Sequence, residues 1–155
     1  METSELSAPS SASTSNSNNN PLFAIPAGLV GALIGAVVWG ALAYYTDREY
    51  GMVAWGIGVL TGFLVGTVAK QTSFFAQGWA VLCSLVGIAV GKYLVFWVIV
   101  SEMMKEESGL AELPLFSQEL FADFIEVLPE TLSFYDALWA GLAIVSAYQL
   151  TRAKE

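Results

Sequence analysis

The chain has 155 residues, of which 55% are hydrophobic and only 13% are charged, and its formal net charge is -8 at pH 7. This composition is more apolar than that of soluble domains and predicts a single membrane domain, while the acidic balance excludes a nucleic-acid-binding surface. Histidine is absent and Cys83 is the one cysteine. We therefore expect no intrachain disulfide, no metal site and no cofactor.

Residues 1–20 are rich in serine, asparagine and threonine and contain no lysine or arginine. Such a segment has too little apolar surface to offset the entropy of ordering, so we predict a disordered tail and a membrane domain over residues 21–155. A signal peptide would place a basic region directly before its apolar core. The first apolar segment is therefore expected to remain in the mature protein.

Two uncharged segments, residues 22–45 and 51–69, follow each other with only residues 46–50 between them. A helix of about 20 residues crosses a bilayer core of about 30 Å, so these segments predict a hairpin of two spans. Aromatic side chains gather around its turn, which places the turn at a membrane–water interface. They are Tyr44, Tyr45, Tyr50 and Trp55.

Small residues recur every four positions in both helices of this hairpin. Such stripes allow helix backbones to approach closely inside a bilayer, so we predict that the two stripes pack against each other. The alternatives are that the stripes form an oligomer contact, or that glycine is simply frequent in membrane helices. The candidate packing residues, which include two in the next apolar segment, are Gly28, Gly31, Gly35, Gly40, Gly58, Gly62, Gly66, Gly87 and Gly91.

Two further spans are predicted at about residues 79–100 and 132–150, and each is interrupted by one charge, Lys92 or Asp136. Both positions lie near the same predicted interface, close enough for the lysine side chain to reach the carboxylate. We expect an intramembrane charge pair. Two alternatives remain: Lys92 extends toward the headgroups while Asp136 is hydrated, or the two groups serve ion or proton transport.

The acidic loop between these spans, residues 101–130, has Lys105 as its one basic residue. Ser117 is placed to cap a short helix that has an apolar face opposite an acidic one. The pattern predicts a helix lying on the membrane surface, whose acidic face prefers water or a basic partner protein. The apolar face consists of Leu120, Phe121, Phe124, Ile125 and Leu128, and the acidic face of Glu119, Asp123 and Glu126.

Four spans place both termini on one side of the membrane. The basic residues on that side are Lys70, Arg152 and Lys154, against Arg48 and Lys105 in the opposite loops. This asymmetry favours cytoplasmic termini. The predicted fold is an all-α integral membrane four-helix bundle with one acidic amphipathic loop helix.

Three segments are similar to a family of small bacterial integral membrane proteins. Residues 28–42 (GLVGALIGAVVWGAL) and 50–62 (YGMVAWGIGVLTG) resemble that family's first hairpin, and residues 134–143 (FYDALWAGLA) resemble its final span, where an aspartate precedes a leucine-tryptophan pair. The resemblance implies the four-span architecture and a bacterial inner membrane. It implies no activity, because none is established for the family.

The sequence favours a structural or accessory protein that packs within a membrane assembly, with the lipid bilayer and a membrane protein or further copies of the chain as partners. We expect no enzyme, because Asp136, Cys83 and Ser84 are the only reactive candidates in the spans and no base accompanies them. The alternative function is a small homo-oligomeric channel or transporter that uses Lys92 and Asp136.

Overall fold

The computed structural model describes residues 23–46, 48–69, 74–108 and 114–152, and these ranges contain five α-helices and no strand. The predicted all-α class is therefore confirmed. The predicted disordered tail lies outside the described residues. The helices are α1 (Ala24–Thr46), α2 (Met52–Val68), α3 (Phe74–Ser108), α4 (Gln118–Thr131) and α5 (Phe134–Arg152).

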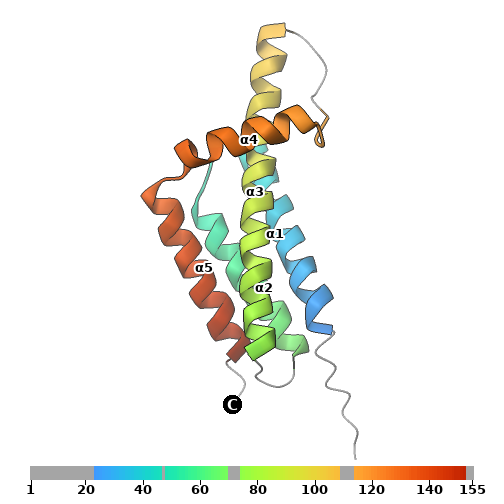
Figure 1. Cartoon of the computed structure of the whole chain (residues 1–155), viewed down its shortest axis with the longest axis vertical. Helices are drawn as coiled ribbons and strands as arrows, with labels where there is room; N and C mark the ends of the chain where they lie inside the picture. Colours follow the sequence, from blue (N-terminus) through green and yellow to red (C-terminus); the bar gives the residue numbers. More distant parts are fainter. Residues whose placement is uncertain (1–22, 47, 70–73, 109–113, 153–155) are drawn as a thin grey trace, which may run out of the picture.

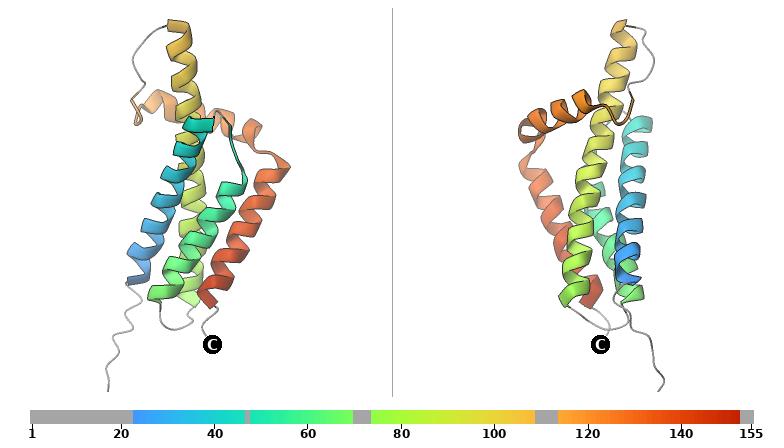
Figure 2. Two further views of the ribbon diagram at one scale, coloured as in Figure 1. Left: turned by 180° about the vertical axis from the view of Figure 1, so that it is seen from behind. Right: turned by 45° about the vertical axis from the view of Figure 1, so that its right-hand side comes forward.

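Four of the helices run side by side in alternating directions, and α4 lies across one end of them (Figures 1 and 2). Helices α2 and α3 form the inner pair, because α1 packs on both of them from one side and α5 packs on both of them from the other. The start of α1 and the end of α5 lie at the end of the molecule opposite α4. The α1–α2 link therefore lies near α4.

Helix α3 is longer than predicted, because it begins at Phe74 and continues to Ser108. Residues 101–108, predicted to be part of the acidic loop, are therefore helical, and α3 projects past α4 (Figure 1). No glycine or proline follows Gly91 in α3, and such residues are the usual signals that end a helix. Lys105 in the last turn forms an ion pair with Glu102 at 3.1 Å, and this pair stabilises the exposed end of the helix.

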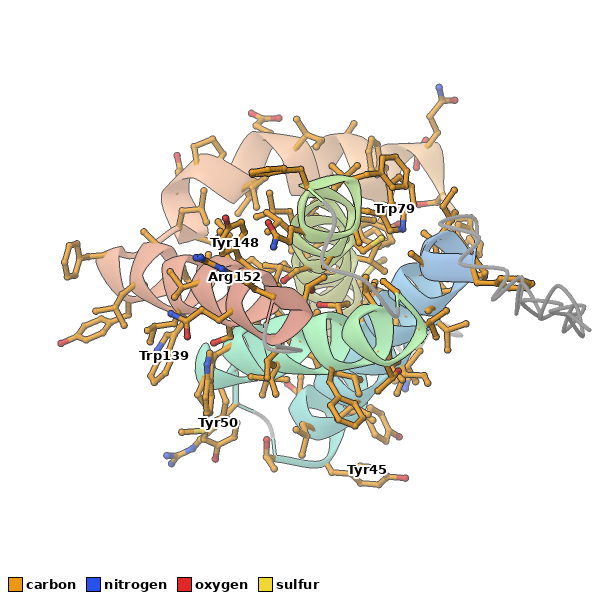
Figure 3. All side chains as sticks on the ribbon, turned by 90° about the horizontal axis from the view of Figure 1, so that it is seen from below. Tyr45, Tyr50, Trp79, Trp139, Tyr148 and Arg152 are labelled. Carbon is orange, nitrogen blue, oxygen red and sulfur yellow. The ribbon has the colours of Figure 1, made fainter. Side chains whose placement is uncertain are left out.

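The interior of the bundle is built largely from small side chains, and the large apolar ones point outward. The buried alanines come from all four of the side-by-side helices, and Trp39 is the largest fully buried residue. Viewed along the bundle axis, side chains project from the outer surface of the bundle (Figure 3). The buried alanines are Ala24, Ala32, Ala36, Ala43, Ala54, Ala76, Ala80, Ala143 and Ala147.

Helix α1 and the Phe74–Glu106 part of α3 are long and apolar enough to cross a membrane by length and composition. Helix α2 is apolar but shorter, with 17 residues. Core helices of soluble proteins can reach the same length and composition, so the outward exposure of the large apolar side chains is the stronger sign of a membrane environment.

Candidate functional site

The glycine stripe of α2 faces α5, not α1, so the predicted packing of the two hairpin stripes against each other is wrong. A Cβ atom on Gly62 would lie 2.7 Å from the Cα of Ala147, and one on Gly58 would lie 2.5 Å from the Cα of Ala143. The physical reason lies in α5, whose alanines also stand four residues apart. Two stripes of small residues allow the closest approach in the bundle.

The glycines of α1 divide between two neighbours. Gly31 and Gly35 face α2, where Cβ atoms would meet the Cα of Thr61 at 3.1 Å and the Cγ1 of Ile57 at 2.7 Å. The others face α3. Gly28 lies against Cys83 and Trp79, and Gly40 lies against Leu94.

The two candidate glycines of α3 also face neighbouring helices. Gly87 lies against Ile57 and Ala32, and Gly91 lies against the ring of Trp39, with 2.6 Å from its Cβ position to Cε3. Only a glycine leaves room for the indole at this point. The buried tryptophan therefore holds α1 and α3 in register, in a bundle that otherwise has few large core residues.

At the α4 end of the bundle, a charge cluster joins three parts of the chain. The Nζ atom of Lys92 in α3 lies 2.8 Å from Oε1 of Glu49 and 3.3 Å from Oδ1 of Asp136. The Lys92 side chain is 8% exposed, that of Asp136 15% and that of Glu49 35%. The structure thus brings together the two residues expected to pair and adds a carboxylate from the α1–α2 link.

Asp136 also caps its own helix. Its Oδ2 atom accepts hydrogen bonds from the backbone N–H of Ser133 at 2.9 Å and from the Ser133 hydroxyl at 3.0 Å, while the backbone N–H of Asp136 donates to Ser133 Oγ at 3.3 Å. This reciprocal arrangement is a capping box. One carboxylate oxygen therefore fixes the start of α5, and the other meets Lys92.

Glu49 was missed by the sequence reasoning, although a signal was present. The link at residues 46–50 is predicted to lie at the membrane interface that is nearest to Lys92. Any carboxylate in that link is therefore a candidate partner for this lysine. The adjacent Arg48 is exposed. The structure selects Glu49 because α1 and α3 pack side by side up to this level.

Helix α4 covers the charge cluster. It begins at the predicted cap, where Ser117 Oγ accepts a hydrogen bond from the backbone N–H of Leu120 at 3.0 Å, so this prediction is confirmed. Phe124 is buried, and its ring lies 5.4 Å from that of Tyr93 and 5.6 Å from that of Phe96. The Tyr93 hydroxyl donates to the carbonyl of Leu115 at 2.6 Å. These contacts dock α4 on α3.

Two cavities lie beside α4 where it covers the charge cluster. A small one of about 60 Å³ lies between the charge cluster and α4, and Glu49, Lys92 and Thr131 are its polar lining residues. A larger groove of about 760 Å³ runs between α3 and α4 and is lined almost wholly by apolar side chains. Lys92 borders both spaces.

The chemistry available to this cluster is electrostatic. One ammonium and two carboxylates leave a formal charge of -1 in a largely buried place. Cys83 and Ser84 are buried two to three turns away along α3. Among the described residues, no group of three or more His, Cys, Asp or Glu side chains is arranged to hold a metal ion.

No protein-family model matches the chain, and comparisons with curated proteins and with solved structures returned no significant match. The resemblance to small bacterial membrane proteins therefore stays a prediction.

Proposed function

We propose that this chain is a multi-pass membrane protein of the bacterial inner membrane, with a structural or accessory role inside a membrane assembly. The observation that carries the proposal is the arrangement of small side chains inside the bundle and large apolar ones outside. Soluble proteins rarely expose contiguous apolar surface on this scale, whereas a bilayer requires it. On α1 alone the exposed large aliphatic residues are Leu29, Val30, Leu33, Ile34, Val37, Val38 and Leu42.

The same pattern extends the proposal to four spans. Helix α5, with 19 residues, exposes Leu138, Leu142 and Val145, and α2 exposes Phe63 and Val68. A span needs about 17–25 helical residues, and the 17 residues of α2 meet that requirement at its lower limit. Helix α4 would then lie in the interface, at the level of the exposed tyrosines of the α1–α2 turn.

The charge cluster favours a structural role over transport. Lys92 contacts two carboxylates that belong to other parts of the chain, so the lysine joins α3 to the α1–α2 link and to α5. The transport alternative rests on the second carboxylate, because a cluster with a formal charge of -1 can accept a cation or a proton. We propose no enzymatic role.

Membrane integration has a direct test. The protein should stay in the membrane fraction after washing with alkaline carbonate and should be released only by detergent. Purification in mild detergent should then recover one or more membrane proteins in fixed stoichiometry with the chain. Recovery of a homo-oligomer alone would favour the transport alternative, and release by carbonate would contradict membrane integration altogether.

Topology gives a second expected result. Reporter fusions at Glu155 should be active as cytoplasmic reporters, and fusions inserted within residues 106–112 should be active as exported ones, because the basic residues favour cytoplasmic termini. An exported reporter at the C-terminus would reverse the orientation. If the two reporters lie on opposite sides of the membrane, whichever side each one takes, the chain crosses the membrane an odd number of times between them.

A further inference from the structure

We propose that α5 crosses the bilayer only as a partner of α2 and α3, because it is not apolar enough to enter the membrane by itself. The inference rests on the proposed four-span membrane location. Helix α5 has 19 residues, the length of a span, yet by composition it does not reach the apolarity that marks α1 and α3. Asp136 in its first turn, Ser146 in its second half and Gln149 near its end each oppose transfer into lipid.

Two polar side chains of α5 have their partners on the other helices. The Oδ1 atom of Asp136 lies 3.3 Å from Nζ of Lys92 in α3. The Ser146 hydroxyl accepts a hydrogen bond of 2.9 Å from Nε1 of Trp55 in α2. A polar group without a partner is costly in lipid. Both partners belong to helices that precede α5 in the chain, so α5 has them only when it enters the membrane beside α2 and α3.

Close packing against α2 further stabilises the inserted helix. The two helices lie side by side (Figure 2), and a Cβ atom on Gly62 would lie 2.7 Å from the Cα of Ala147. One turn later, a Cβ atom on Gly66 would lie 2.7 Å from the carbonyl oxygen of Leu150. Lipid provides no hydrophobic drive for helix association, so the van der Waals attraction between closely placed backbones holds α5 in place. Loss of this contact should therefore change the topology of the chain as well as its stability.

Reporters fused after Glu155 in the full-length chain test this dependence in bacterial cells. Green fluorescent protein reports a cytoplasmic location and alkaline phosphatase an exported one. Gly62→Leu makes α2 more apolar but fills the contact with α5, so the Glu155 reporter should move to the side of the membrane that holds residues 106–112. Gly56→Leu is the matched control, because a Cβ atom there meets nothing within 4 Å. It should keep the wild-type location.

Leucine substitutions in α5 separate the effect of packing from that of apolarity. Ala147→Leu makes α5 more apolar but pushes it away from Gly62, so it should move the Glu155 reporter as Gly62→Leu does. Gly141→Leu makes α5 more apolar at an exposed position where a Cβ atom meets nothing within 4 Å, and it should leave the reporter in place. Gly141→Leu together with Gln149→Leu should restore the crossing of α5 in the Gly62→Leu chain, which a general folding defect would not allow.

A Glu155 reporter that keeps its wild-type location in both Gly62→Leu and Ala147→Leu would overturn the proposal. An equal shift in Gly56→Leu and Gly62→Leu, or a failed rescue, would overturn it as well. If Gly62→Leu chains are degraded, the comparison of Ala147→Leu with Gly141→Leu decides. In the wild type, reporters at Glu155 and within residues 106–112 on the same side of the membrane would instead contradict the four-span arrangement itself, so the two failures are distinguishable.

Discussion

Gly58→Ala is expected to lower the free energy of unfolding by about 2 kcal/mol, even though one methyl group is all that it adds. That methyl carbon would lie 2.5 Å from the Cα of Ala143 and 2.6 Å from its Cβ, and it would press on the Ala143 carbonyl oxygen as well. Backbone atoms cannot rotate out of the way as a flexible side chain can, so α5 must move away from α2 along their contact. Unfolding by sodium dodecyl sulfate, followed by far-ultraviolet circular dichroism in mild detergent, measures the loss.

Gly56→Ala is the matched control, because it makes the same substitution two residues earlier in α2. A Cβ atom at Gly56 would meet no atom within 4 Å. Alanine has a higher helix propensity than glycine, so this variant should be unchanged or more stable by up to about 1 kcal/mol. The expected gap between the two variants is therefore about 2–3 kcal/mol. Equal stabilities would mean that α2 and α5 do not pack closely along this stripe.

Lys92→Met is expected to destabilise the protein by about 3 kcal/mol, the lower end for a broken buried ion pair, because the Glu49 side chain keeps 35% exposure. The substitution leaves two carboxylates near each other without a cation. Asp136→Asn should cost less, about 1 kcal/mol, because Lys92 keeps its 2.8 Å contact with Glu49. The same detergent unfolding experiment gives both values.

The triple variant Lys92→Met, Glu49→Gln, Asp136→Asn removes all three charges and keeps their approximate volumes. It should recover most of the stability lost in Lys92→Met, because no unpaired charge remains. Additive losses would mean that the three groups do not interact. A triple variant that is stable but inactive in a growth or flux assay supported by the wild type would favour the transport alternative. A stable and fully active one would exclude it.

The local features of α4 were predicted well from the sequence. The serine cap, the apolar face and the acidic face are properties of neighbouring residues within one helix, so spacing alone identifies them. The capping box of Ser133 and Asp136 is local in the same way, because the two residues stand three apart at the start of α5. Helix ends were less well predicted, and α3 continues to Ser108 because nothing in its sequence stops it before residue 109.

The helical class, the apolar segments and the faces that carry small residues follow from the sequence, because they depend on composition and on a period of 3.6 residues. Which of these faces meet depends on how the helices pack. Gly62 could pack against any helix with a small stripe, and the alanines of α5 provide the closest match. The pairing of Glu49 with Lys92 was likewise decided in three dimensions, because residues 43 positions apart come within 2.8 Å only when α1, α2 and α3 pack together.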